Sequence, residues 1–471
     1  MVDSIRHYCG LFGIVNHPDA AEFTFYGLYA QQHRGQEAAG IVSVDDAGIA
    51  RTHRGMGLVS DVFSEDVIRS LEGTTAIGHA RYSTAGSSVL ANTQPILVRY
   101  RHGTLAVAHN GNLTNADQLR RDLVGRGSLF QSTMDTEAIV HLIARSDRDS
   151  AEEQLRDALL RLEGAYSLLV TIGRVMYAVV DARGFRPLML GRVGDAPVVA
   201  SESCALDIIG ARFLCELEPG SVVRIEGSRV DYLEPLPPAP LTRCVFELVY
   251  FSRPDSVIFG ESVDQYRRQL GRQLAREHPA PDADCVFSVP DSSNAAALGF
   301  SEESGVRLEH ALIRNHYVGR TFIHPVQSGR DAKVRIKYNA VREIIGGKKV
   351  VVVDDSIVRG TTSRGLVTMI RQAGAREVHF RVASPPTVGP CYYGIDTPTR
   401  EELIASNHDV EEIRRFLEVD SLGYISLQGM LHASAGDPER FCHACFSNQY
   451  PTPIPADAAK LRLEAGLTRT P

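Results

Sequence analysis

The hydrophobic pattern of the first half of the chain predicts a domain built from short strands. Residues 104–108, 167–172 and 222–225 are short runs typical of alternating β-strands. Two stretches with helical spacing interrupt them, near residues 25–38 and near residues 135–145. This mixture of many strands with a few helices indicates an α+β domain.

The second half of the chain has a different pattern, in which an apolar strand leads through a Gly- or Ser-rich turn into an amphipathic helix. Residues 284–289 are followed by such a helix at 292–303, and residues 349–353 by another at 363–373. Strands that alternate with helices favour a parallel sheet, so we expect an α/β domain here.

A proline-rich break separates the two patterns. Residues 231–243 contain four prolines, which cannot lie inside a helix or a central strand, so they predict an extended connector. A chain of 471 residues is too long for one compact core. We therefore expect one domain over residues 9–240, a second over 241–450, and a loosely held tail over 451–471.

Composition narrows the class of protein. The chain is 44% hydrophobic and 23% charged, with a net charge of −7, which argues against a dedicated nucleic-acid or membrane-surface binder. No apolar run approaches the ~18 residues that span a bilayer. Residues 1–8 lack the apolar centre of a secretory signal, so we expect a cytoplasmic location. Eight cysteines in so long a chain indicate metal binding or catalysis more than a disulfide scaffold.

The most informative segment is KKVVVVDDSIVRGTTSR, residues 348–364. Four valines predict a buried strand, and Asp354 and Asp355 stand at its carboxyl end, where open α/β sheets bind ligands. Gly360 and the hydroxyls of Ser356, Thr361 and Thr362 predict a loop whose N–H groups bind a phosphate at a helix N-terminus. Carboxylates repel phosphate, so their expected partners are sugar hydroxyls and Mg²⁺. Together these groups predict a phosphoribosyl site, the alternative being an acidic strand end with a Ser/Thr helix cap.

Two further segments fit an anionic substrate. Residues 288–294, SVPDSSN, follow another apolar strand and open a helix, which predicts a pyrophosphate site; the alternative is an ordinary helix cap. Residues 320–342 contain six basic residues and one acid. Such a segment predicts a loop that closes over the substrate, and the alternative is a solvated surface loop.

Cys9 stands directly before the apolar run GLFGIV. If residues 1–8 were removed as a propeptide, the α-amine of Cys9 would be the base nearest to its thiol. An α-amino group titrates near ~8, so at cellular pH it can accept the thiol proton. The alternative is that Cys9 is a small buried core residue.

Five motifs occur in order along the first domain: CGLFGI from residue 9, QQHRGQE from 31, GHARYST from 78, HNGNL from 109 and MDTE from 134. Together they resemble the N-terminal-nucleophile glutamine amidotransferases, which implies an αββα sandwich with Cys9 as nucleophile. The resemblance implies that Arg81 binds the α-carboxylate of glutamine and Asp135 its α-ammonium. It also implies an oxyanion hole made by Asn110 and the N–H of Gly111. Taken separately, Arg81 could be a surface ion pair and Asn110-Gly111 a type I′ turn.

The segment at residues 348–364 likewise resembles the fingerprint of type I phosphoribosyltransferases for phosphoribosyl pyrophosphate (PRPP), which implies a mostly parallel sheet. It implies that Asp354, Asp355 and Ser292 hold Mg²⁺–PRPP. It also implies that the loop of Arg359, Gly360, Thr361, Thr362 and Ser363 binds the 5′-phosphate.

A glutaminase joined to a PRPP site resembles the amidophosphoribosyltransferase family. The resemblance implies that PRPP, glutamine and water give 5-phosphoribosylamine, glutamate and pyrophosphate, with ammonia passed through the protein. This is the first committed step of de novo purine synthesis. Feedback inhibition by purine nucleotides and a homotetramer are implied in the same way.

Four of the cysteines could hold a metal. Cys442 and Cys445 form a C-x-x-C pair, and four thiolates formed with Cys244 and Cys391 suit a structural zinc or an iron–sulfur cluster. One branch of the family carries a 4Fe–4S cluster at the matching positions and is made with a propeptide, so the resemblance implies this branch. The remaining alternative is four unconnected thiols.

Two other functions remain compatible with parts of the sequence. Another amidotransferase with the same first domain, such as a hexosamine-phosphate or asparagine synthase, would not need the PRPP loop at residues 354–363. A non-catalytic PRPP-sensing regulator would not need the glutaminase residues of the first domain.

Overall fold

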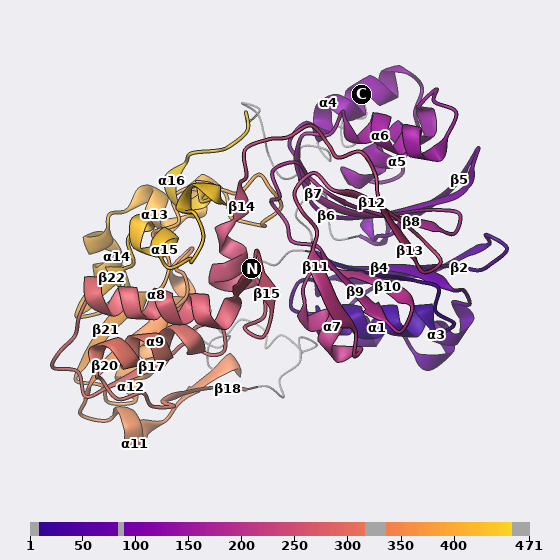
Figure 1. The fold of residues 1–471 in the computed structure, drawn as a ribbon. Coiled ribbons are helices and arrows are strands. Elements are labelled where there is room, and N and C mark those ends of the chain that lie inside the picture. Colours follow the sequence, from indigo (N-terminus) through magenta and orange to yellow (C-terminus); the bar gives the residue numbers. More distant parts are fainter. Residues whose placement is uncertain (1–8, 83–88, 316–335, 455–471) are drawn as a thin grey trace.

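The computed structural model describes residues 9–82, 89–315 and 336–454 (Figure 1). The predicted propeptide, most of the predicted closing loop and most of the predicted tail lie outside these ranges. None of the described helices is long and apolar enough to cross a membrane.

The first part of the chain forms two stacked antiparallel sheets. One sheet has seven strands in the order β11-β9-β10-β1-β4-β2-β3. Its strands are β1 Gly10–Val15, β2 Ala38–Val44, β3 Ala50–Met56, β4 Thr75–Arg81, β9 Met189–Val193, β10 Ala196–Ala200 and β11 Arg212–Glu216. The other has six strands in the order β13-β12-β8-β7-β6-β5. Its strands are β5 Ile96–Tyr100, β6 Gly103–Leu113, β7 Gly164–Ile172, β8 Val175–Val180, β12 Val222–Glu226 and β13 Arg229–Tyr232.

Apolar side chains of both sheets, among them Leu11, Ile77, Ala106 and Leu169, form one buried cluster between them. Helices cover the outer faces (Figure 1). Over the seven-stranded sheet lie α1 Ala20–Ala30, α2 Val59–Val62, α3 Glu65–Ser70 and α7 Cys204–Ile208. Over the six-stranded sheet lie α4 Ala116–Gly125, α5 Thr136–Arg145 and α6 Ala151–Leu159, and η1 Leu90–Asn92 precedes β5. The predicted αββα sandwich is confirmed.

One predicted helix of this region is wrong in its extent. The helix expected near residues 25–38 ends at Ala30, and Ala38 already begins β2. The intervening residues turn so that Gly35 can lie against the backbone of β4, where a Cβ atom would stand 2.4 Å from the carbonyl of Ala80. This close approach requires glycine and excludes a continued helix.

The later part of the chain carries the predicted parallel sheet, in the order β17-β20-β21-β22. Its strands are β17 Cys285–Ser288, β20 Lys349–Asp354, β21 Glu377–Val382 and β22 Ser421–Tyr424. The valines of β20 point alternately to the two faces of this sheet. Val351 and Val353 belong to one buried cluster, and Val350 and Val352 belong to another. The first cluster includes α8 Val263–Glu277 and α9 Asn294–Ser304, and the second includes α12 Thr361–Gln372 and α14 Val410–Leu417.

Short elements complete this region. Between β13 and β14 the chain has no helix or strand, as the prolines predict. The remaining elements are β14 Arg243–Cys244, η2 Glu247–Phe251, β15 Val257–Ile258, β16 Glu261–Ser262, β18 Leu312–Arg314, β19 Tyr338–Ala340, α11 Arg342–Ile345, η3 Arg400–Glu402, α13 Ile404–Asn407, α15 Leu427–His432, η4 Pro438–Arg440, β23 Phe441–Cys442 and α16 Ala444–Ser447. η2 is a single π-helical turn. β14 pairs in parallel with β23, so the start of this region is tied to its end.

Candidate functional site

Cys9 lies directly before β1, the strand that pairs with β4. Its thiol is buried and donates to the carbonyl of Tyr82 at 3.8 Å. Its own carbonyl accepts a hydrogen bond of 3.1 Å from Nε of Arg34. Burial raises the pKa of the thiol to about 11, against the opposing effect of nearby arginines. The buried thiol is therefore protonated at neutral pH and needs a base before it can act as a nucleophile.

Arg81 and Asp135 lie within electrostatic reach of Cys9, since the charges of both act on the pKa of its thiol. Arg81 ends β4 and is fully buried, so the alternative of a surface ion pair is wrong. Asp135 caps α5 and accepts from the N–H groups of Thr136 at 2.8 Å and Leu113 at 3.0 Å. Burial works to raise the pKa of Asp135, but His109 and these N–H donors outweigh it and hold the pKa below its ordinary value.

Asn110 and Gly111 lie within β6, so the alternative of a type I′ turn is wrong. Asn110 is fully buried, and neither its amide nitrogen nor its amide oxygen has a hydrogen-bond partner among the described residues. Gly111 has φ +148°, and a Cβ atom there would stand 2.0 Å from the carbonyl of Ala165. An unpaired buried amide is costly unless a ligand satisfies it, which fits a donor held ready for an oxyanion.

Asp354 and Asp355 lie at the carboxyl end of β20, nearly buried, as the sequence predicts. Ser292 and Ser356 donate their hydroxyls to the two carboxylate oxygens of Asp355, the latter at 2.7 Å. Burial, and then the neighbouring charge of Asp355, raises the pKa of Asp354 well above its ordinary value. Burial also raises the pKa of Asp355. Two crowded carboxylates with oxygen donors around them are what a hard divalent cation stabilises.

The loop after β20 turns into α12 at Gly360, which has φ +76° and a Cβ position only 2.9 Å from Ile404. Thr361, Thr362 and Ser363 form the first turn of α12, whose N–H groups have no partner within the helix. Within the described part of the chain, the buried hydroxyl of Thr361 has no hydrogen-bond partner. Arg359 forms an ion pair with Glu402 at 2.9 Å. These hydroxyls and the N-terminus of α12 thus form a site of the kind that binds an anion.

The four predicted metal-binding cysteines come from three segments that meet. Cys244 stands opposite Cys442 in the pairing of β14 with β23. Burial, and then the Cys244 thiol, raises the pKa of Cys391 to about 11 and also raises that of Cys445. The four thiols therefore lie near one another, although their grouping as metal ligands stays a prediction. As the side chains stand, however, no three or more His, Cys, Asp or Glu side chains of the described ranges are grouped to hold a metal ion.

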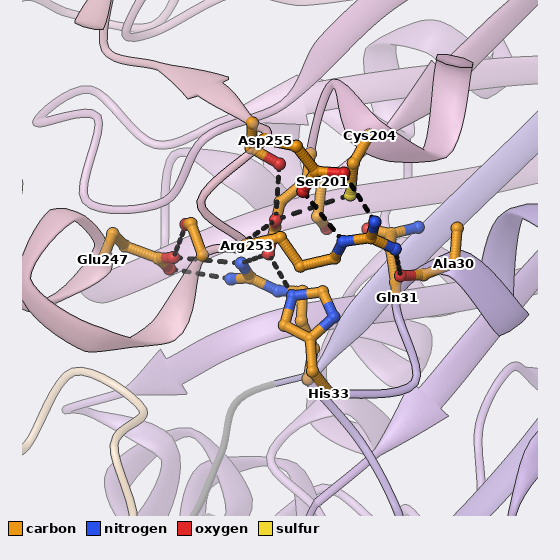
Figure 2. Close-up of polar contacts among 12 residues, drawn as sticks. Ala30, Gln31, His33, Ser201, Cys204, Glu247, Arg253 and Asp255 are labelled. Carbon is orange, nitrogen blue, oxygen red and sulfur yellow. Dashed lines mark hydrogen bonds and ion pairs between the residues drawn. The ribbon is translucent and has the colours of Figure 1, made fainter. Parts of the chain in front are cut away.

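Sequence reasoning missed a buried ionic cluster between the two regions. Arg34 donates to Glu247 at 2.8 and 3.0 Å and also pairs with Glu202. Glu202 in turn contacts His33 at 2.7 Å, and Figure 2 shows Glu247, His33 and Arg253 in this cluster. A signal existed in the sequence, because Glu247 is the one charged residue in the otherwise apolar run VFELVYF.

Comparison with known proteins places the chain in one family. The profile of a glutamine amidotransferase domain matches residues 79–207. Amidophosphoribosyltransferase of Bacillus subtilis is 47% identical over 99% of both chains, and that of Rhizobium etli is 47% identical over 96% of this chain and 93% of the relative. A solved structure of glutamine PRPP amidotransferase from B. subtilis, complexed with ADP and GMP, has a TM-score of 0.90 at 47% identity, covering 96% of this chain and 99% of that one. Near-full-length similarity at this level shows that the chain belongs to the amidophosphoribosyltransferase family, glutamine-dependent enzymes of the first committed step of purine biosynthesis.

Proposed function

We propose that Cys9 and the first turn of α12 are the two reaction centres of this amidophosphoribosyltransferase. The observation that carries the proposal is the buried, unpartnered amide of Asn110, which lies in the same sandwich as Cys9, Arg81 and Asp135. A fully buried amide without a partner is rare in a folded protein, and an oxyanion formed at Cys9 would accept a hydrogen bond from its amide nitrogen.

In the first half-reaction, the Cys9 thiolate attacks the amide carbon of glutamine. The amide nitrogen leaves as ammonia, and water hydrolyses the resulting glutamyl thioester to glutamate. Arg81 binds the α-carboxylate of glutamine and Asp135 its α-ammonium, while Asn110 and the N–H of Gly111 bind the oxyanion. The thiol pKa of about 11 explains why a base is needed. We assign this role to the α-amine that Cys9 would gain if residues 1–8 were removed as a propeptide.

In the second half-reaction, ammonia attacks C1 of PRPP and pyrophosphate leaves, a pentosyl transfer. The hydroxyls and N–H groups of Thr361, Thr362 and Ser363 bind the 5′-phosphate, together with Ser356, Arg359 and Gly360. Mg²⁺ would neutralise pyrophosphate charge, with Asp354, Asp355 and the Ser292 hydroxyl beside it. The raised pKa values of the two carboxylates support this assignment, because burial disfavours their charged forms and a bound cation would offset that cost.

We further propose that Cys244, Cys391, Cys442 and Cys445 hold a 4Fe–4S cluster rather than zinc. The convergence of three chain segments on the four thiols supports a metal group that joins the start of the second domain to its end. The group takes no part in the chemistry proposed above. Iron and acid-labile sulfide analysis of anaerobically purified protein should give about four of each per chain, whereas stoichiometric zinc would contradict this assignment.

The domain limits at residues 9–240 and 241–450, a homotetrameric assembly and feedback inhibition by purine nucleotides belong to the same proposal. The B. subtilis relative binds ADP and GMP in its solved structure, which supports nucleotide inhibition here. Inhibition of the purified enzyme by these two nucleotides tests it, and its mass in solution tests the assembly.

The Cys9→Ala variant tests the central assignment. It should lose phosphoribosylamine synthesis from glutamine and keep synthesis from added ammonium, because ammonium bypasses the first site. A Cys9→Ala enzyme that still used glutamine would contradict the mechanism.

A further inference from the structure

The π-helical turn η2 lies between the two reaction centres. At one end, the side chain of Glu247 is fully buried and accepts hydrogen bonds from Arg34, Arg186 and Ser252. At the other end, Tyr250 lies near the PRPP acids, since the charges of Asp355 and Asp354 add to the effect of burial in raising its pKa. One short segment therefore has neighbours in both sites.

From Glu247, one path leads to the nucleophile. Arg34 uses both terminal nitrogens on the Glu247 carboxylate, at 2.8 and 3.0 Å, and uses its Nε on the carbonyl of Cys9, at 3.1 Å. A guanidinium is rigid and planar, so fixing one edge fixes the direction of the other donor. Glu247, together with Glu202, therefore orients the guanidinium that binds the Cys9 carbonyl.

A second path leads from Glu247 to the oxyanion strand. Arg186 donates to Glu247 at 3.1 Å and to the carbonyl of Tyr393 at 2.5 Å. Gly394, the next residue, lies against Gly111 so closely that a Cβ atom on Gly394 would stand 2.8 Å from the Gly111 carbonyl carbon. Asn112, on the other side of Gly111, donates to the carbonyl of Tyr392 at 2.9 Å. The loop held by Arg186 thus packs on the strand that carries Asn110 and Gly111.

η2 is itself fixed to the second domain. Arg267 of α8 donates to the carbonyl of Leu248 at 2.9 Å and to that of Ser252 at 2.8 Å. It therefore clamps both ends of the turn. Asp355 lies within electrostatic reach of this guanidinium. The side chain that holds η2 by two hydrogen bonds is therefore also an electrostatic neighbour of Asp355.

Glu247 is ionised in this cluster. Burial works to raise its pKa, but the guanidinium groups of Arg34 and Arg186 outweigh it and hold the pKa below its ordinary value. Replacing a buried ion pair by apolar side chains is often neutral or stabilising, so stability alone does not call for a carboxylate here. A carboxylate does provide what an apolar residue lacks, which is fixed directions for two arginines.

We propose that Glu247 is a positioning residue, through which the phosphoribosyltransferase domain holds the Cys9 backbone and the oxyanion strand of the glutaminase in their working geometry. The inference rests on the proposed role of Cys9 as the nucleophile. It assigns the communication between the two sites to η2, with Glu247 acting on the glutaminase and Arg267 receiving the state of the PRPP site.

The Glu247→Gln variant tests this inference, with Asp255→Asn as the matched control. Asp255 lies in the same stretch of chain but pairs with Arg253 at the surface, and both are drawn in Figure 2. In Glu247→Gln, kcat for glutamine hydrolysis in the presence of PRPP should fall about 10- to 100-fold, the usual cost of a small misplacement of reacting groups. KM for glutamine and the ammonia-dependent rate should each stay within about two-fold, because Glu247 touches neither substrate. Asp255→Asn should behave as the wild type.

A second measurement separates positioning from loss of the fold. Alkylation of Cys9 by the glutamine analogue 6-diazo-5-oxo-L-norleucine should be faster with PRPP in the wild type and independent of PRPP in Glu247→Gln. Ser252→Ala removes only the hydroxyl that donates to Glu247 at 3.0 Å. It should lower the effect of PRPP on alkylation in the same direction but by about two- to five-fold.

Two results would overturn the inference. One is a Glu247→Gln enzyme whose alkylation still responds fully to PRPP. The other is a parallel loss of the ammonia-dependent rate, which would indicate a structural role only. Failure of the proposed function would look different, because the Cys9→Ala enzyme would then retain glutamine-dependent synthesis.

Discussion

The two candidate reaction centres are built in opposite ways. The glutaminase centre combines β1, β4, β6 and the start of α5, so its residues are far apart in the sequence. The phosphoribosyl centre comes mainly from one stretch, the end of β20 and the first turn of α12, with Ser292 added from the loop before α9.

Their electrostatics differ as well. In the first centre, burial keeps a thiol protonated, at a pKa of about 11, so the thiol must lose a proton before it can react. In the second, burial raises the pKa values of two carboxylates, and the charge of Asp355 raises that of Asp354 further, so a bound cation would favour their charged forms. Burial therefore favours the uncharged form of the reactive groups in both centres, and each centre can be tested separately.

The largest expected effect falls on the first centre alone. Replacing Asn110 by Ala should lower the glutaminase kcat by about 10²- to 10³-fold, because one of two oxyanion donors is lost. The ammonia-dependent rate, measured on the same preparation, should remain within about two-fold of the wild type. An equal loss of both rates would show that the two centres are not separable.

The next effect falls on the second centre. Asp355→Asn should lower both the glutamine-dependent and the ammonia-dependent synthesis by about 10- to 100-fold, as expected for removing a charged ligand group. Asp284→Asn is the matched control, because Asp284 accepts from the N–H of Lys349 at the opposite end of the same sheet. If the Asp284 variant lost PRPP-dependent activity and the Asp355 variant did not, the PRPP site would lie at the end of the sheet opposite to the one proposed.

The raised pKa of the Cys9 thiol predicts a pH profile. In chain that retains residues 1–8, alkylation of Cys9 by iodoacetamide should rise about ten-fold per pH unit from about pH 7 upward, because the reactive thiolate fraction does so below the pKa. The rise should level off near the raised pKa of about 11. Mass spectrometry of the peptide that contains Cys9 measures the rate, and a plateau near neutral pH would contradict the raised pKa.

The smallest expected effect concerns a single hydroxyl. Thr361→Val should raise KM for PRPP by about two- to ten-fold, the usual value of one neutral hydrogen bond, because the buried Thr361 hydroxyl is assigned to the phosphate. Thr368→Val provides the control on the same helix, since the Thr368 hydroxyl bonds to the carbonyl of Arg364 instead. An unchanged KM for PRPP in Thr361→Val would remove this residue from the proposed site.

The same contrast explains how much could be predicted from the sequence. The strand, the acid pair and the loop are contiguous at residues 349–363. A local sequence pattern therefore predicts the strand β20 and the start of α12. The glutaminase residues were predicted through five separate motifs and a family resemblance, because no local pattern shows that strands β1 and β6 lie in facing sheets.

The ionic cluster could not be predicted in this way. Arg34 and Glu247 are 213 residues apart, and their pairing is fixed only by how the two regions pack. The C-terminal end of α1 at Ala30 could not be predicted for a related reason. The close approach of Gly35 to β4 is a tertiary constraint that overrides the helical spacing of residues 31–38.

We expect ammonia released at Cys9 to reach PRPP within the protein, as the family resemblance implies. The direct test gives the enzyme PRPP and glutamine labelled at the amide nitrogen, in the presence of excess unlabelled ammonium, at a pH where ammonium is a poor external donor. If ammonia stays within the protein, the phosphoribosylamine should carry the label at nearly the enrichment of the glutamine. Dilution of the label to the ratio of the bulk solution would show that ammonia leaves the protein between the two sites, and would contradict the account.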